Sequence, residues 1–246
     1  MYEISVRVRF SDIGTNNRLR LYELPKYFQD SSIEHSESLG IGIPYLRPRN
    51  LAWLLTSWQI DIIRLPGYDE RLTIRTWPYD FKGAFGYRNY EMLSSGGEVL
   101  VKAYAIWLHT DIQEMKPVRV PEEEAAGYGV EAKLDMEYLP RKIQLPTGME
   151  EVDRVPVNRH LADMYQHMNN AMYVDIASDY IPEAGKVMRI RVDYRKQVKV
   201  GDILVVKRAW EENHCFVAFY DEADDMHVST EFILDDAETY KGKDNI

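Results

Sequence analysis

The 246-residue sequence contains one cysteine and lacks long apolar runs. A single cysteine excludes an internal disulfide framework and is typical of a reducing compartment. No stretch of about 18 apolar residues occurs, which argues against a membrane-spanning helix and a membrane partner. No basic segment followed by an apolar one precedes the strand-like alternation of residues 2–10, so we expect no signal peptide and a cytoplasmic location. Cys215 lies in an apolar, strand-like run and is predicted to be an inert core thiol.

Several chemical signatures are also missing from the sequence. There is no G-x-S-x-G nucleophile elbow, no phosphate-binding P-loop and no dinucleotide-binding fingerprint. No group of Cys, His, Asp or Glu residues has a recognised metal-ligand spacing. We therefore expect neither a metal ion nor another cofactor.

Positive charge is scarce overall but locally concentrated. The formal net charge is −10, which argues against general binding of nucleic acid. The segment 186–208 nevertheless holds eight basic residues against only Asp193 and Asp202, whereas residues 211–246 hold eleven acids. Alternating solvated strand faces would explain this distribution. A surface that attracts an acidic partner would explain it equally well.

The hydrophobic pattern of the first half predicts a strand, a helix and then several strands. A strand over 2–10 precedes a helix over 21–39, which Gly40 is placed to end. The residues that recur at helical spacing are Leu21, Leu24, Phe28, Ser32, His35 and Leu39. Strand-like runs follow at 52–63, 70–81, 85–95 and 97–110. Residues 111–150 are rich in Pro, Glu and Gly and have weak periodicity, which favours a boundary between two units.

The second half repeats this order. A helix begins near residue 170, and strand-like runs follow at 186–210, 215–224 and 226–236. Two copies of a helix followed by four or five antiparallel strands indicate a duplicated α+β unit. We therefore expect an N-terminal unit over 1–125, a linker over 126–150 and a C-terminal unit over 151–246.

The two halves align at an offset near 150 residues, which falls to about 132 beyond the helix. The pairs that matter for chemistry are Asp12 with Asp163, Asn16 with His167, and Leu65 with Gln197. Because the histidine and the glutamine occur only in the second copy, we expect a single active site built mainly by the C-terminal half.

The segment DMYQHMNN, residues 163–170, has more polar chemistry than a helix start needs. Asn169 or Asn170 is expected to cap the helix. The N-terminus of a helix offers unpaired N–H groups and a positive dipole end, which can polarise a carbonyl or hold an oxyanion. The Asp163 carboxylate and the His167 imidazole beside it can orient or activate water. A purely structural turn with a surface histidine remains the alternative.

The segment HMNNAMY, residues 167–173, resembles the H-V-N-N-x-x-Y signature of the acyl-ACP thioesterases of fatty-acid synthesis. Three further segments resemble the same family in the same order, at 11–40, 51–78 and 192–202. This resemblance implies a double hotdog, in which two tandem units each wrap an antiparallel sheet around a long helix. It also implies hydrolysis of the thioester that joins a fatty acyl chain to the phosphopantetheine arm of acyl carrier protein (ACP). In the family the N-terminal half chiefly shapes the acyl pocket.

The family's catalytic residues transfer only in part. Its Asp-x-Asn-x-His segment matches Asp163 and His167, but Tyr165 stands where the family has Asn. Gln197 stands where the family has a Glu, and an amide cannot act as a base. A phenol of ordinary pKa is mostly protonated at pH 7, so Tyr165 is expected to donate a hydrogen bond to the thioester oxygen. Gln197 is expected to orient the attacking water.

The remaining site residues are predicted to bind substrate; they are Asn169, Asn170, Arg195 and Lys196. Three alternatives to an acyl-ACP thioesterase stay open. One is a hotdog hydrolase that acts on acyl-CoA, and another is a hotdog dehydratase that acts on a 3-hydroxyacyl group. The third is a non-catalytic acyl-ACP binding protein whose site has lost its activity. A homodimer is optional, because the duplication already pairs two hotdogs.

Overall fold

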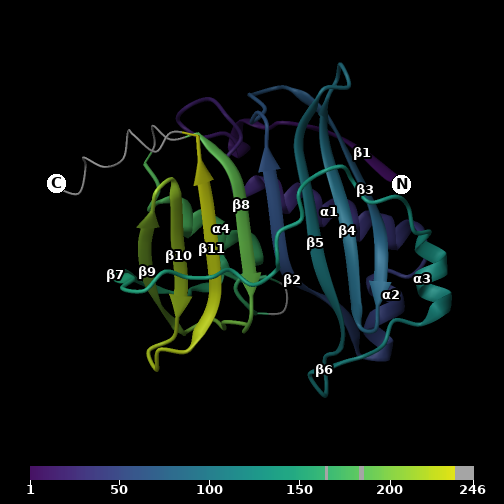
Figure 1. Ribbon diagram of the computed structural model, residues 1–246. Helices are drawn as coiled ribbons and strands as arrows, with labels where there is room; N and C mark the ends of the chain where they lie inside the picture. Colours follow the sequence, from purple (N-terminus) through teal and green to yellow (C-terminus); the bar gives the residue numbers. More distant parts are fainter. Residues whose placement is uncertain (164–165, 183–185, 236–246) are drawn as a thin grey trace. The chain divides into compact units, whose positions relative to one another are not determined.

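The structure of the protein is a computed structural model that describes residues 1–163, 166–182 and 186–235. The chain forms two compact units, Met1–Tyr138 and Leu139–Ile246 (Figure 1). The division falls inside the segment 126–150 that was expected to be a linker. Within the described ranges, the structure has no helix with both the length and the apolar character needed to cross a membrane.

The N-terminal unit is an antiparallel sheet crossed by one long helix. Its strands follow the order β1-β3-β4-β5-β2, with the short β6 paired to β5. The helix α1 contacts β1 and β3 on one face of this sheet (Figure 1). The elements are β1 Tyr2–Arg7, η1 Phe10–Asp12, α1 Glu23–Ser38, α2 Ile43–Leu46, η2 Arg47–Arg49, β2 Leu51–Ile62, β3 Arg71–Lys82, β4 Phe85–Ser94, β5 Val99–Asp111, β6 Lys116–Pro117 and α3 Glu122–Tyr128.

The sequence pattern of α1 explains how it packs. Leu24, Phe28, Ser32 and His35 recur at three- or four-residue intervals and are all buried, as predicted. The Phe28 ring lies 5.2 Å from the ring of Tyr90, whose hydroxyl forms a 2.8 Å hydrogen bond with the Ser32 hydroxyl. Burying a phenylalanine contributes roughly 1.5–3 kcal/mol, so this face anchors the helix. The helix ends at Ser38 and Gly40 has a φ of +73°, which confirms the predicted stop.

The C-terminal unit repeats the strand–helix–four-strand order. Its strands follow the order β8-β11-β10-β9-β7, all antiparallel. The helix α4 contacts β11 and lies across one face of this sheet (Figure 1). The elements are β7 Glu150–Pro156, η3 Arg159–Leu161, α4 Asn170–Ser178, β8 Val187–Tyr194, β9 Ile203–Glu211, β10 His214–Tyr220 and β11 Met226–Leu234. The α+β class predicted from the sequence is confirmed in each unit.

The helix of the second unit is shorter than the expected long helix. It has 9 residues, whereas α1 has 16. Just after the C-terminal end of α4 the backbone forms a tighter, 3₁₀-type turn: the Tyr180 N–H donates to the Ala177 carbonyl, three residues back, at 3.2 Å. Pro182 then follows and has no N–H to continue a helix. Tyr173 lies on the buried face of α4, and its ring packs edge-on against that of Phe219, with the ring centroids 5.2 Å apart.

Three elements within residues 111–156 were not predicted: the two-residue strand β6, helix α3 and strand β7. Strand β7 lies at the edge of its sheet, and five of its seven residues are exposed, so it has no alternating apolar pattern to find. Helix α3 begins with three glutamates and buries only Glu124 and Tyr128, which leaves its helical periodicity equally weak.

Candidate active site

The loop before α4 is a tight turn closed by main-chain hydrogen bonds. The Asp163 N–H donates to the His167 carbonyl at 2.7 Å, and the Gln166 N–H donates to the Asp163 carbonyl at 3.1 Å. Gln166 has a φ of +65°, in the left-handed region, which reverses the chain. The Asp163 carboxylate accepts a further hydrogen bond from the main-chain N–H of His167 at 3.2 Å. The turn thereby fixes the acid and the histidine next to each other.

The same turn docks against the segment that follows β8. The Met168 N–H donates to the Val198 carbonyl at 2.9 Å, and His167 forms a β-bridge with Lys199. These contacts bring the residues around Gln197 beside the 163–168 turn, although about thirty residues separate them in sequence. The side chains of Asp163 and Gln197 are exposed and that of His167 is half-buried, so solvent reaches the cluster.

The two asparagines fix the start of α4. Asn169 is the N-cap, and its side-chain oxygen accepts a hydrogen bond from the Ala171 N–H at 3.0 Å, which confirms the predicted cap. Asn170 is the first helical residue, and its carbonyl accepts a hydrogen bond from the Tyr194 hydroxyl at 2.9 Å. Burial raises the pKa of Tyr194 well above its usual range, so the phenol stays a donor. This contact was not foreseen, because nothing in the sequence marks Tyr194 as an anchor for the helix.

Tyr165, the remaining member of the predicted catalytic group, lies outside the described residues. Main-chain contacts thus bring the other three members, Asp163, His167 and Gln197, to one helix start, where Asp163 and Gln197 are exposed and His167 is half-buried. A carboxylate and an imidazole held in this way can take a proton from water. The positive end of the α4 dipole can stabilise negative charge that develops nearby.

The N-terminal unit contains the same turn with different side chains. The Gly14 N–H donates to the Arg18 carbonyl at 2.8 Å, and the Asn17 N–H donates to the Gly14 carbonyl at 3.0 Å. Asn17 has a φ of +57°, and the Leu19 N–H donates to the Pro66 carbonyl at 2.8 Å. Each of these contacts has its counterpart in the turn before α4, so the two turns are equivalent.

This equivalence corrects the alignment made from the sequence. The hydrogen bonds pair Gly14 with Asp163 and Arg18 with His167, an offset of 149, so the pairings of Asp12 with Asp163 and Asn16 with His167 were wrong. The sequence comparison matched identical residues and gave an offset of 151. In the structure the left-handed residues of the two turns, Asn17 and Gln166, are equivalent, which gives an offset of 149. Beyond the helix, the pairing of Pro66 with Val198 keeps the predicted offset of 132. The first turn carries neither an acid nor an imidazole at the two key positions.

Asp12, which the sequence had paired with Asp163, has a structural role instead. Its side chain is buried and accepts hydrogen bonds from the Tyr27 hydroxyl at 2.6 Å and from the Arg9 N–H at 3.0 Å. These hydrogen bonds lower the pKa of the Asp12 carboxyl against the effect of its burial, so it stays ionised. The N-terminal half therefore lacks a counterpart of the Asp163 carboxylate as well as of the His167 imidazole.

The two basic residues predicted to bind substrate are both engaged with acids. The Arg195 Nε lies 3.0 Å from a carboxylate oxygen of Asp193, whose side chain is 1% exposed. The Lys196 Nζ lies 2.9 Å from Asp225, and both of these side chains are exposed. Within the described part of the chain, at least five of the eight basic residues of the 186–208 stretch form such ion pairs: Lys186, Arg191, Arg195, Lys196 and Lys207. Much of the positive charge of this stretch is neutralised within its own unit.

Cys215 and the possible metal ligands were the remaining candidates for chemistry. Cys215 is fully buried, and burial raises the pKa of its thiol to about 12, so the predicted inert thiol is confirmed. Across residues 1–163, 166–182 and 186–235, no group of three or more His, Cys, Asp and Glu side chains could hold a metal ion.

Two family models match the chain in order. The acyl-ACP thioesterase N-terminal domain matches residues 1–128, and the acyl-ACP thioesterase C-terminal domain matches residues 146–234. The chain belongs to the acyl-ACP thioesterase family. The resemblance inferred from HMNNAMY and the three other segments is thereby confirmed.

Curated relatives of the chain include plant proteins. An acyl-[acyl-carrier-protein] hydrolase from Cuphea viscosissima, FATB3, is 23% identical over 217 residues, which cover 81% of this chain and 52% of that protein. Oleoyl-acyl carrier protein thioesterase 1 from Arabidopsis thaliana is 22% identical over 227 residues, covering 82% of this chain and 62% of that protein. The chain therefore spans only about half to three-fifths of the length of these relatives.

Solved structures of acyl-ACP thioesterases share the fold. One from Bacteroides thetaiotaomicron has a TM-score of 0.88 at 19% identity and covers 95% of this chain and 97% of its own. The 12:0-ACP thioesterase from Umbellularia californica has a TM-score of 0.83 at 14% identity, with coverages of 95% and 96%. The predicted double hotdog is thus confirmed as the fold of this family member.

Proposed function

We propose that this protein hydrolyses the thioester between a fatty acyl chain and the phosphopantetheine arm of ACP, releasing free fatty acid in fatty-acid biosynthesis. The observation that carries the proposal is the match of both family domains, in order, across residues 1–128 and 146–234. The curated relatives are named as hydrolases or thioesterases of acyl-ACP. A cytoplasmic location and an optional homodimer stay predictions.

In the proposed mechanism Asp163 and His167 act as one unit. Together they hold a water molecule and remove its proton as the water oxygen attacks the thioester carbon. The negative charge that develops on the thioester oxygen is stabilised by the N-terminal end of α4, whose geometry Asn169 and Asn170 fix. The carbon–sulfur bond then breaks, and the phosphopantetheine thiolate takes the proton from the base. The products are a fatty acid and ACP with a free thiol.

Gln197 and Tyr165 are assigned supporting roles. The Gln197 amide can accept from and donate to the water that Asp163 and His167 deprotonate, and thereby orient it. Tyr165 is proposed to donate a hydrogen bond to the thioester oxygen. Lys196, the more exposed of the two basic residues proposed to bind substrate, is available to the carrier; Arg195 is chiefly the counter-ion of Asp193.

One observation favours a second candidate function, a non-catalytic acyl-ACP binding protein. Gln197 replaces the family's glutamate, and a general base is typically worth about 10²–10⁴ in rate. We favour the enzyme, because the turn still holds an acid and an imidazole next to each other at the helix start.

Release of free fatty acid from purified acyl-ACP, compared with the same acyl chain on CoA, tests this proposal. We expect steady turnover of acyl-ACP and a lower kcat/KM for acyl-CoA, because CoA lacks the carrier's protein surface. Equal or better hydrolysis of acyl-CoA would favour the acyl-CoA hydrolase instead. Tight binding of acyl-ACP with no release would favour the non-catalytic binder, and release only from a 3-hydroxyacyl substrate by loss of water would favour the dehydratase.

A further inference from the structure

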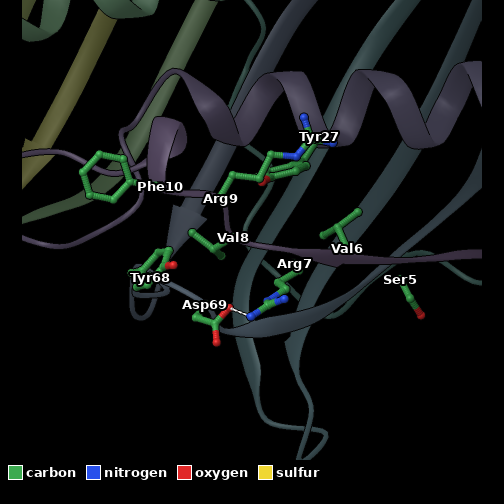
Figure 2. A pocket seen from close by; sticks show the side chains of 9 residues that line it. All are labelled: Ser5, Val6, Arg7, Val8, Arg9, Phe10, Tyr27, Tyr68 and Asp69. Carbon is green, nitrogen blue, oxygen red and sulfur yellow. Dashed lines mark ion pairs between the residues drawn. The ribbon is translucent and has the colours of Figure 1, made fainter.

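A cleft in the N-terminal unit has no role in the proposed chemistry. It has a volume of about 470 Å³ and runs along the end of β1, between the start of α1 and the loop that precedes β3 (Figure 2). Its lining residues are Ser5, Val6, Arg7, Val8, Arg9, Phe10, Tyr27, Tyr68 and Asp69. Main-chain hydrogen bonds hold its walls together; the Val8 N–H donates to the Glu70 carbonyl at 3.0 Å, and the Asp69 N–H donates to the Val8 carbonyl at 3.1 Å.

Two aromatic side chains at this cleft are unusually exposed. Phe10 is 78% exposed and Tyr68 is 53% exposed, and their rings meet edge-on with centroids 6.1 Å apart (Figure 2). A single exposed apolar residue needs no explanation, but a paired aromatic contact beside a cleft is typical of an interaction site. The cleft is large enough to receive an apolar side chain of a partner.

Four arginines lie in the chain segment that contains Phe10. Residues 7–20 contain Arg7, Arg9, Arg18 and Arg20, all exposed, and their only acid is the buried Asp12. The loop 66–69 lies beside them, because Arg18 forms a β-bridge with Gly67 and Leu19 bonds to Pro66. We call Arg7, Arg9, Phe10, Arg18, Arg20 and Tyr68 the arginine–aromatic surface.

The acids near this surface leave it positive. Arg7 forms an ion pair with Asp69. Glu70, whose pKa is lowered in part by the charge of Arg18, is already held by Arg64 through two hydrogen bonds of 2.8 and 3.0 Å. The buried Asp12 carboxylate accepts hydrogen bonds from Tyr27 and Ser11 and offsets the charge of Arg9, so the positive charge of the surface rests chiefly on Arg18 and Arg20. A positive surface of this kind attracts an acidic partner by charge complementarity.

The surface also includes the non-catalytic copy of the active-site turn. Arg18 occupies the position equivalent to His167, and Gly14 the position equivalent to Asp163. The duplication has therefore kept the backbone of the turn in this unit while replacing acid–imidazole chemistry by a cation. By contrast, the 186–208 stretch, which the sequence suggested as the positive surface, is largely neutralised by its own ion pairs.

We propose that the arginine–aromatic surface docks the acyl carrier protein. The arginines receive acidic side chains of the carrier, and the cleft beside Phe10 and Tyr68 receives an apolar one. This inference rests on the proposed function, because it names the surface by which that function recognises its protein-borne substrate.

The test compares three variants. Arg9→Gln/Arg18→Gln removes two charges without placing a new negative charge beside Asp12 or Glu70. Phe10→Ser removes the exposed ring. The matched control, Arg47→Gln/Lys142→Gln, removes two exposed charges elsewhere. KM and kcat are measured on acyl-ACP and on the same acyl chain carried by pantetheine alone, and binding of acyl-ACP is measured by calorimetry. Thermal unfolding of each variant checks that it is folded.

We expect the arginine variant to raise KM for acyl-ACP about tenfold at low salt, since a lost interfacial charge mainly slows association. Its kcat/KM on acyl-pantetheine and its unfolding temperature should match the control. The difference from wild type should shrink near 1 M salt, where screening acts over about 3 Å. Phe10→Ser should raise KM at every salt concentration.

An arginine variant with the KM and the binding affinity of the control would overturn the docking surface, while turnover of acyl-ACP would leave the proposed function intact. A wild type that hydrolyses neither substrate would overturn the function. Weaker calorimetric binding by the variants would still support the docking surface in that case. If the variants lose binding only to vesicles of anionic phosphatidylglycerol, the surface belongs to a membrane contact and the proposal is wrong.

Discussion

Asp163→Asn and His167→Ala are each expected to lower kcat on acyl-ACP by roughly 10²-fold or more, the range typical of a lost general base. The double variant should lose little further activity, because groups that act as one unit lose rate non-additively. The turn supports this expectation, since the carboxylate of Asp163 is tied to the main chain of His167 at 3.2 Å. The measurement is release of free fatty acid at saturating acyl-ACP.

A matched control accompanies this pair. His160→Ala removes an exposed histidine of η3, in the same stretch of chain, and should leave kcat unchanged. Asp163→Asn keeps an oxygen that can accept from the His167 N–H, so the turn should persist and loss of activity would report chemistry. Near-normal turnover in both single variants would remove the catalytic assignment from this turn.

Arg195→Glu is expected to destabilise the protein by about 3 kcal/mol, at the lower end of the cost of breaking a buried ion pair. Asp193 is 1% exposed, and it lies 3.0 Å from Arg195 and 3.5 Å from Arg141. The variant would set a second carboxylate against a buried one, while Arg141 would still compensate part of the charge. In thermal unfolding this corresponds to a loss of roughly 6–12 °C for a chain of this size.

Lys196→Glu is the control for this prediction. Lys196 pairs with Asp225 at the surface, where 51% and 65% of the two side chains are exposed, and such pairs are worth about 0–1 kcal/mol. Its unfolding temperature should stay near that of the wild type. Equal unfolding temperatures for the two variants would contradict the structural role given to Arg195. Lys196→Glu is also the cleaner probe of substrate binding, because it leaves Asp193 paired.

The parts of the fold with strong periodicity could be predicted from the sequence. The buried face of α1 and the four strands after it follow from spacing, but the single run expected at 186–210 is two strands, β8 and β9. Strand β7 and helix α3 present too few apolar residues to be predicted. The length of α4 could not be predicted, because the 3₁₀-type turn at Tyr180 that follows it leaves no mark on the hydrophobic periodicity.

The sequence indicated which residues gather before α4 but not the geometry that holds them; their catalytic role stays a prediction. Asp163, His167 and the Asn169 cap could be recognised from their positions before a helix. The register between the two turns could not be predicted, because main-chain hydrogen bonds set it. The equivalent left-handed residues, Asn17 and Gln166, are different amino acids, so the sequence does not reveal their equivalence. The ion pair between Arg195 and Asp193 could not be predicted either, because only the folded sheet buries Asp193.

The central claim is that a family member with glutamine at position 197 is an active thioesterase. The most direct test is kcat against pH, on one acyl-ACP, for the wild type and for Gln197→Glu. We predict clear turnover by the wild type and an unchanged or lower rate in the variant. In the proposed mechanism Asp163 and His167 already activate water, and the added carboxylate would raise the pKa of one of the two acids by like-charge repulsion. A nearly inactive wild type, together with a large rise in kcat and a new acidic limb in the variant, would contradict this account.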